Sequence, residues 1–394
     1  MNLPLEGIKV LELAKTLAGP VSGQMLGDLG AEVIKVEQPG IGDESRHMKP
    51  PEWNGESCFY LSSNRNKKSI TLNLKSEQGR QIVYELVKES DILIENFRTG
   101  VTEKLGIDYE TLLKINPRLI YLSISGFGRT GPEKYRAGYD LLLQGYSGFM
   151  STTGEPDVPY KTGPSVVDLS TGFLGALGVL AALLARDKTG KGQFIDCGLL
   201  DGQIMVLNHL ATGFYATGQS AKPMGQGHNS LVPYQVFKAK DKNIILAAAN
   251  DALWVKTCEA MGWLDLLEYN LFKTNSLRVE NREKLIPILS GRIRNISSDE
   301  ICTKLDEAGV PCGPINSIGE ALTSPQVVAR EMMVRINHPK IKDLRTPAFP
   351  VKLSETPATV RLPPPSLGEQ TEEILTSLGL SFEEIDNFRK NGVI

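Results

Sequence analysis

Short aliphatic segments and longer amphipathic segments alternate along the first 200 residues, and this alternation constrains the fold more than any other feature. We predict strands in five segments rich in branched apolar residues: IKVLEL (8–13), EVIKVE (32–37), SITLNL (69–74), DILIENF (91–97) and LIYLSISGF (119–127). Helices are predicted between them, one with Pro20 at its start and another over residues 77–90. Buried strands that alternate with helices predict an α/β fold with a doubly wound, Rossmann-like parallel sheet. Ligands of such sheets bind at the carboxyl ends of the strands.

The loop after the first predicted strand argues against a dinucleotide site, the most familiar use of this kind of sheet. It reads AKTLAGP and lacks the GxGxxG pattern, whose glycines let the backbone approach a pyrophosphate. We therefore disfavour a nicotinamide-dependent dehydrogenase.

Composition is typical of a soluble globular protein with more than one domain: 394 residues, 41% hydrophobic and 23% charged. A formal net charge of −3 argues against a general binder of nucleic acid or of an anionic membrane. The longest apolar run, residues 172–185, is shorter than the ~20 residues that cross a bilayer. We expect it to form a buried core helix.

Cysteine and histidine spacing predicts no disulfide framework and no metal site. Five cysteines are scattered without a CxxC pair, and four histidines lie far apart in the sequence. The amino-terminal residues lack the basic start and apolar stretch of a secretory signal. These features predict a cytoplasmic protein.

A Gly/Pro/Ser-rich stretch, GQSAKPMGQGHNS, indicates a domain boundary. We predict a large α/β domain over residues 1–205, a linker over 206–228 and a small α+β domain over 229–325. Residues 326–394 are predicted to return to the large domain and to end in a helix over 382–390.

Asp168 is the acidic residue that we consider first as a candidate catalytic group. It lies in PSVVDLSTG, before an expected small-residue turn at 170–172 and the apolar helix. Acidic residues commonly cap helices, and a helix N-terminus favours a carboxylate that stays ionised at neutral pH. An ionised carboxylate is also what a nucleophile requires. The motif alone leaves capping and catalysis both open.

Several segments in a fixed order resemble the family III CoA-transferases. They are LPLEGIKVLEL, DLGAEVIKVEQPGIGDESR, NRNKKSITLNLK, DILIENFRTG, NPRLIYLSISGFGRTGP, RAGYD, VVDLSTG, KTGKGQFIDC and AGVPCGPINS. NGESCFYLSSNRNKKSI and HNSLVPYQVF are more similar to the branch that uses succinyl-CoA and glutarate than to the oxalate or carnitine branches. The resemblance covers nearly the whole chain. It implies interlocked homodimers, in which each chain passes through a ring formed by the other.

The resemblance implies a covalent mechanism centred on Asp168. Its carboxylate would attack an acyl-CoA to give an aspartyl–acyl anhydride, and the released thiolate would then form an aspartyl–CoA thioester. A carboxylic acid acceptor would take the CoA in the reverse steps. Backbone N–H groups near residues 170–172, or in the small domain, are candidate donors to the oxyanions. The CoA thioester is a substrate, so we expect no separate cofactor and no metal.

The resemblance also places CoA contacts at the ends of the predicted strands. The matching positions are Leu17, Ala18, Leu72, Asn73, Lys75, Asn96, Phe97, Arg98, Lys104, Arg136, Ala137 and Asp140. We expect the arginines and lysines among them to bind phosphates. Tyr139 matches a position near the thioester. Gln38 and Leu17 depart from the oxalate-type pattern, where arginine and glutamine are found.

Two other functions stay open as alternatives to succinyl-CoA:dicarboxylate transfer. One is CoA transfer to a different acid, carnitine-like or oxalate. A 2-methylacyl-CoA racemase is the other, but such relatives carry a histidine where this chain has Tyr139, and tyrosine, with a pKa near ~10, is a poor base at neutral pH. A non-catalytic CoA-binding protein is disfavoured by the intact VVDLSTG.

A dicarboxylate substrate needs a cation for its second carboxylate, because an unpaired buried charge is costly. Arg46, Arg65 and His228 are the candidates, and we expect Arg46 to be the first of them because it follows the second strand's carboxyl end.

Overall fold

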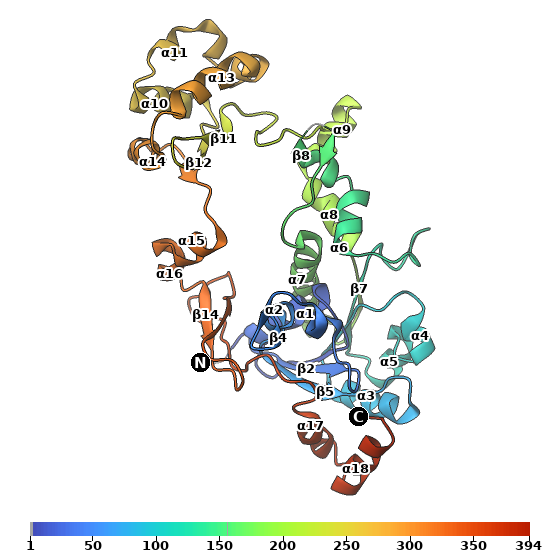
Figure 1. The fold of residues 1–394 in the computed structure, drawn as a ribbon. Coiled ribbons are helices and arrows are strands. Elements are labelled where there is room, and N and C mark those ends of the chain that lie inside the picture. Colours follow the sequence, from blue (N-terminus) through green and yellow to red (C-terminus); the bar gives the residue numbers. More distant parts are fainter. Residues whose placement is uncertain (1–2, 156) are drawn as a thin grey trace. The chain divides into compact units, whose positions relative to one another are not determined.

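The computed structural model describes residues 3–155 and 157–394, which form two compact units (Figure 1). The first unit comprises the chain up to Phe149, Thr162–Gly218 and Gln326–Ile394, and the second comprises Met150–Lys161 and Gln219–Pro325. The linker predicted over residues 206–228 is therefore divided between the units. A short hairpin of β8 (Gly154–Glu155) and β9 (Val158–Pro159) belongs to the second unit, where the N–H of Gly225 donates to the carbonyl of Gly154.

A parallel sheet organises the first unit, and in the described residues it has six strands in the order β10-β7-β6-β1-β2-β5. The strands are β1 (Lys9–Glu12), β2 (Glu32–Glu37), β5 (Lys67–Thr71), β6 (Ile92–Glu95), β7 (Ile120–Ser125) and β10 (Phe194–Gly198). The chain runs outward from β1 to β5, then crosses back to β6 beside β1 and continues the other way. This confirms the predicted parallel α/β sheet, and its topological switch point lies between β1 and β6.

Alternating side chains of the strands face two layers of helices. Val10, Ile94 and Leu122 belong to a core with α1 (Ala18–Asp28) and α7 (Val166–Thr189). Leu11 and Leu93 belong to a second core, whose helices are α3 (Glu77–Glu89), α5 (Tyr109–Ile115), α17 (Thr371–Ser377) and α18 (Phe382–Lys390). Both faces of the sheet are thus buried, as parallel strands require.

Shorter elements complete the first unit. They are β3 (Glu52–Trp53), β4 (Glu56–Ser57), α2 (Cys58–Ser63), α4 (Val101–Leu105), α6 (Asp140–Tyr146), α8 (Leu199–Leu207), α9 (His209–Thr217), β14 (Met333–Ile336) and β15 (Leu344–Pro347). The carboxyl-terminal helix α18 has the predicted bounds, and its side chains pack in the second core of this unit.

Helix α7 differs from the prediction in two respects. It begins at Val166, so Asp168 lies in its first turn and residues 170–172 are helical rather than a turn. It is also not buried on every face, because Phe173, Leu177 and Leu184 are 47%, 62% and 67% exposed. Among the described residues α7 is the one helix whose length and composition would suffice to cross a membrane, yet one side of it packs on α1 and the sheet.

A glycine allows α1 and α7 to pack closely. Ser22 donates from its hydroxyl to the carbonyl of Gly172 at 2.8 Å, and a Cβ on Gly172 would lie 2.7 Å from the carbonyl oxygen of Ala18. The small residues of α7 therefore bring its first turns against the start of α1, which directly follows the β1 loop.

The second unit contains an antiparallel sheet of β11 (Tyr234–Lys238), β12 (Asn243–Ala247) and β13 (Cys312–Pro314). Its helices are α10 (Asp251–Met261), α11 (Asp265–Glu268), α12 (Asn275–Glu280), α13 (Arg282–Ile293), α14 (Ser298–Glu307) and α15 (Ile318–Thr323), and α16 (Pro325–Ala329) follows at the boundary. Trp254, Phe237 and Leu285 are central to its separate hydrophobic core.

Candidate active site

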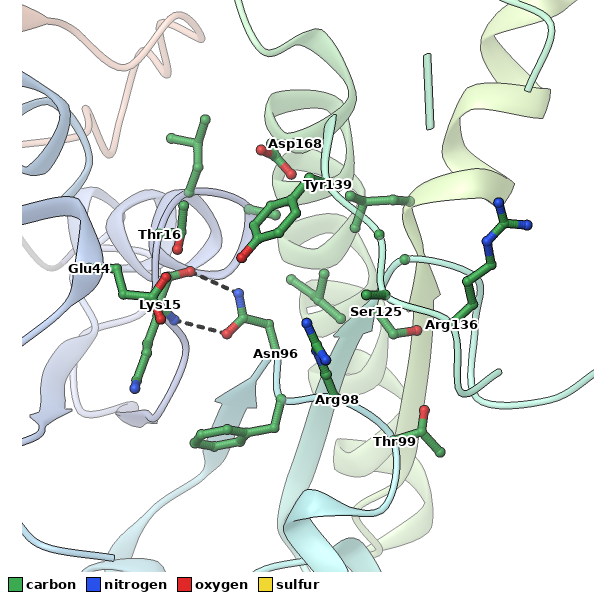
Figure 2. Close-up of a pocket in the computed structure, with 18 of the residues that line it drawn as sticks. Lys15, Thr16, Glu44, Asn96, Arg98, Thr99, Ser125, Arg136, Tyr139 and Asp168 are labelled. Carbon is green, nitrogen blue, oxygen red and sulfur yellow. Dashed lines mark hydrogen bonds between the residues drawn. The ribbon is translucent and has the colours of Figure 1, made fainter. Parts of the chain in front are cut away.

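A hollow of about 250 Å³ opens in the first unit at the carboxyl ends of β1, β6 and β7. Its walls come from the loops that follow these strands, from the segment before α6 and from the first turn of α7 (Figure 2). This is the switch point of the sheet, where a doubly wound fold is expected to bind its ligand.

The loop after β1 forms one wall, and Asn96 at the end of β6 holds it in place. The Asn96 side chain accepts from the N–H of Lys15 at 2.9 Å and donates to the Lys15 carbonyl at 2.8 Å (Figure 2). Asn96 lines the hollow, but both ends of its amide are used by the backbone of Lys15, and its contact with CoA stays a prediction. Leu17 and Ala18 follow in the same wall.

Asp168 reaches the hollow from the first turn of α7. The N-cap residue, Ser165, makes no side-chain capping bond. Instead Asp140 caps the helix from α6: its Oδ1 accepts from the N–H of Val167 at 2.8 Å and from that of Asp168 at 3.3 Å. Capping is therefore performed by Asp140, which leaves the Asp168 carboxyl directed into the hollow (Figure 2).

The pKa of Asp168 contradicts the expectation of a carboxylate fully ionised at neutral pH. Burial, followed by the nearby negative charge of Asp140, raises the pKa of Asp168 to about 7. Asp140 occupies the N–H groups at the helix start and adds a like charge, so the helix end does not favour ionisation as it otherwise would. Perturbed groups of this kind are enriched at functional sites.

The oxyanion donors expected near residues 170–172 are not available there. These residues lie inside α7, where backbone N–H groups bond to carbonyls four residues earlier.

Tyr139 lines the hollow beside Asp168 and is 64% exposed. The position of its segment depends on two glycines. A Cβ on Gly126, at the end of β7, would lie 2.9 Å from the Cα of Gly138. This close contact brings Ala137, Gly138 and Tyr139 to the carboxyl edge of the sheet.

Positive charge predominates in the lining. Lys15, Arg98, Lys134 and Arg136 are the cations among the lining residues, against the carboxyls of Glu44 and Asp168. Phe97 also contributes to the wall. Arg136 lies over the rings of Phe127 and Tyr146, 5.1 and 5.0 Å from their centroids, which restricts its position.

Five predicted CoA contacts are not among the residues that line the hollow, and one of them is Asp140, whose carboxyl caps α7 instead. Leu72 is buried in the second core. Asn73 donates from its backbone N–H and its side-chain amide to the carbonyls of Val393 and Gly392 at the carboxyl terminus. Lys75 is exposed after β5, the edge strand two positions from β1, and Lys104 is exposed on α4. Their contacts with CoA stay predictions.

Two of the three residues proposed as cations for a second carboxylate are already paired within the fold. The Arg46 guanidinium donates to both Glu37 carboxylate oxygens, at 2.8 and 2.7 Å, and also to Tyr60. Arg65 is buried and bonds to Asp28 at 2.9 and 2.6 Å. Neither lines the hollow, so neither is an available cation there. His228 belongs to the second unit, where its ring contacts Tyr234, and its role stays a prediction.

Some lining residues were missed from the sequence: Lys15, Thr16, Glu44, Thr99 and Lys134. Lys15 and Thr16 carried a usable signal, because they directly follow a predicted strand. Lys134 carried none, because it lies in a polar loop.

In residues 3–155 and 157–394 no cluster of three or more His, Cys, Asp or Glu side chains could hold a metal ion.

The chain belongs to CoA-transferase family III, whose sequence model matches residues 5–371. It is similar to the human succinyl-CoA:glutarate CoA-transferase, at 42% identity, with 94% of this chain and 85% of the relative covered. A succinate–glutarate CoA-transferase of Agrobacterium fabrum is 40% identical, with 95% and 96% covered. Among solved structures, a CAIB/BAIF family protein from Brucella suis matches with a TM-score of 0.86 and 41% identity, over 96% of this chain and all of that one. The protein is therefore a CoA-transferase.

Proposed function

We propose that this CoA-transferase moves CoA from succinyl-CoA to a C4–C6 dicarboxylate such as glutarate, with Asp168 as the covalent nucleophile. The observation that carries the proposal is the placement of the Asp168 carboxyl in a cation-lined hollow at the switch point of the sheet. The similarity of this chain to relatives named for succinyl-CoA or succinate and glutarate supports the choice of acids.

The proposed reaction proceeds in balanced steps. The Asp168 carboxylate attacks the thioester carbonyl, the C–S bond breaks, and an aspartyl–succinyl anhydride and CoA thiolate result. The thiolate attacks the aspartyl carbonyl, releases succinate and leaves an aspartyl–CoA thioester. Glutarate then attacks this thioester to form an aspartyl–glutaryl anhydride, and the released thiolate takes the glutaryl group and frees Asp168. No resident metal or cofactor takes part, because an ionised carboxylate is itself the nucleophile.

Lys15, Arg98, Lys134 and Arg136 are proposed to attract the CoA phosphates, with Arg98 and Arg136 offering the fork geometry that suits a phosphate. Tyr139 is proposed to lie against the thioester. A tyrosine at this position disfavours the racemase alternative, which needs a base near neutral pKa.

We also propose a cytoplasmic homodimer, interlocked as in relatives of this family. Apolar side chains are exposed along one series of helices in the first unit: Leu141 and Tyr146 in α6, Phe173 and Leu177 in α7, Met205 in α8 and Tyr215 in α9. An apolar surface of this extent favours a second copy as its cover. The cysteines of the described chain are all free, which suits a reducing compartment.

One assay tests the proposed function. The enzyme is incubated with succinyl-CoA and glutarate, and new thioesters are followed by mass. Glutaryl-CoA and free succinate in equal amounts support the proposal. Epimerisation of a 2-methylacyl-CoA without any transfer would replace it with the racemase alternative.

A further inference from the structure

Three successive residues of the loop after β1, of which Lys15 and Thr16 line the hollow, are each held by a different side chain. The Ala14 carbonyl accepts from Lys35 Nζ at 2.8 Å, and Asn96 bonds to Lys15. The N–H of Thr16 donates to Asp43 Oδ1 at 3.0 Å. Thr16 needs such support because its φ of 71° lies in the left-handed region, which is unfavourable for a β-branched residue.

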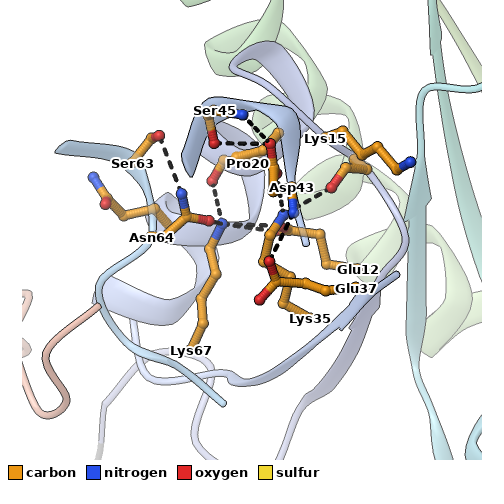
Figure 3. Close-up of polar contacts among 12 residues, drawn as sticks. Glu12, Lys15, Pro20, Lys35, Glu37, Asp43, Ser45, Ser63, Asn64 and Lys67 are labelled. Carbon is orange, nitrogen blue, oxygen red and sulfur yellow. Dashed lines mark hydrogen bonds and ion pairs between the residues drawn. The ribbon is translucent and has the colours of Figure 1, made fainter. Parts of the chain in front are cut away.

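Lys35 and Asp43 belong to a buried charge cluster behind this wall (Figure 3). Lys35 Nζ lies 2.8 Å from Asp43 Oδ2 and 2.9 Å from Glu12 Oε1. Lys67 Nζ contacts Glu12 from the other side at 2.8 Å and donates to the carbonyl of Pro20, in the first turn of α1, also at 2.8 Å. The cluster therefore connects β1, β2 and β5 to both the wall and the start of α1.

Both central charges persist through neutral pH. Burial alone would raise the pKa of Asp43, but Lys35 and the surrounding N–H donors hold it well below its usual range. Burial alone would lower the pKa of Lys35, but Glu12, Asp43 and Glu37 raise it. Asp43 also accepts from the N–H and hydroxyl of Ser45, and so fixes the turn that carries Glu44 into the hollow.

We propose that Asp43 and Lys35 are positioning residues, which hold residues 14–16 in the shape that the CoA thioester requires opposite Asp168. The proposal rests on the proposed use of the hollow as the thioester site. A buried ion pair alone contributes little net stability compared with apolar side chains of similar size. Lys35 and Asp43 bond directly to backbone groups of the loop after β1. These bonds indicate that the pair instead fixes the backbone conformation of that loop.

The experiment compares Asp43→Asn with a matched control, Asp28→Asn. Asp28 is as deeply buried (2% exposed against 1%) and is also ion-paired, with Arg65. Within the described chain its side chain bonds to Arg65 and Asn66 and not to residues 14–16. Asp43→Asn removes the charge that faces Lys35 and presents an amide donor to Lys35, Thr16 or Ser45.

Two readouts are taken on the full-length enzyme. Amide hydrogen exchange at Lys15 and Thr16 is expected to be at least about 10-fold faster in Asp43→Asn than in Asp28→Asn, because the protecting bonds are weakened. With succinyl-CoA, kcat is expected to fall about 100-fold for Asp43→Asn and less than about 3-fold for Asp28→Asn, while KM changes little. If Asp43→Asn does not fold, Asp43→Glu, which keeps the charge but moves its oxygens, is expected to show the same loss of kcat.

Equal exchange at residues 15 and 16 in the two variants, or a kcat loss no larger in Asp43→Asn than in Asp28→Asn, would overturn the positioning role. Asp168→Ala is measured in parallel. If that variant kept its activity, the proposed function would fail, whereas the exchange comparison would still decide whether Asp43 fixes the wall.

Discussion

Asp140 Oδ1 accepts a hydrogen bond from the backbone N–H of Asp168, 3.3 Å away, so two carboxyl groups meet at the start of α7. One caps the helix and the other faces the hollow. Burial raises the pKa of Asp168 most, and the negative charge of the capping Asp140 raises it further, to about 7. The carboxyl proposed as nucleophile therefore ionises at a higher pH than an ordinary aspartate.

Asp140→Asn is expected to move the acidic limb of the activity profile to lower pH. Transfer requires ionised Asp168, so activity rises as pH increases through its pKa. Removing the negative charge of Asp140 lowers that pKa. The measurement is kcat/KM for succinyl-CoA from about pH 5 to 9. Asp187→Asn, near the other end of α7, is the control and should leave the limb in place. If the acidic limb of Asp140→Asn lay at the same pH as that of the wild type, the effect of the Asp140 charge on the pKa of Asp168 would be contradicted.

Asp168→Asn is expected to change the pH dependence of stability. The folded pKa of Asp168 is raised above its unfolded value, so the native state binds more protons between about pH 4 and 7. The stabilisation that protonated Asp168 contributes is then fully present below the pKa that Asp168 has in the unfolded chain. It is lost as the pH rises through the pKa that Asp168 has in the folded protein. Urea denaturation at about pH 4.5 and 8 should show the variant gaining stability relative to wild type at the higher pH. A constant difference would argue against the raised pKa.

Arg98→Ala is expected to weaken CoA-thioester binding by roughly 1.5–3 kcal/mol, the scale of a hydrogen bond to a charged group. Lys104→Ala is the matched comparison, because Lys104 was predicted from the sequence to bind CoA but lies outside the hollow. Calorimetric titration with CoA measures both. Equal losses in the two variants would extend the phosphate site to α4, and no loss in Arg98→Ala would move that site away from the hollow.

Glutarate is expected to be a far better acceptor than butyrate. Both offer one reacting carboxylate, but the second carboxylate of glutarate can pair with a cation, for which His228 and the lysines and arginines of the hollow are the remaining candidates. Butyrate would leave that cation unpaired in a partly desolvated site. The ratio of kcat/KM for the two acids tests this. Equal values would refute the dicarboxylate preference and leave CoA transfer intact.

The parallel sheet could be predicted from the sequence, because strands such as Ile120–Ser125 are short, apolar and separated by amphipathic helices. The edges of the sheet were harder to predict. Lys67 begins β5, although a pair of lysines in a sequence usually suggests a loop. Burial of Lys67 is favourable because its charge pairs with Glu12 on another strand. The observed strand is therefore displaced towards the N-terminus from the predicted segment at 69–74.

Side-chain partners explain most of the differences at the site. Arg46 follows a strand end, as a substrate-binding arginine could, but Glu37 is near enough to pair with it. Asp168 has the sequence context of a helix cap, but Asp140, 28 residues earlier, provides that cap. Such pairings depend on the tertiary fold, and the spacing of residues in one sequence does not contain them.

The most direct test of the account is to find where the enzyme is modified by its donor. The protein is mixed with succinyl-CoA without an acceptor, quenched rapidly, digested and examined by mass spectrometry, with Asp168→Ala as the control. We expect a CoA or succinyl adduct on Asp168 that disappears when glutarate is added and is absent from the control. Continued transfer with an adduct on another residue, or the same adduct in Asp168→Ala, would contradict it.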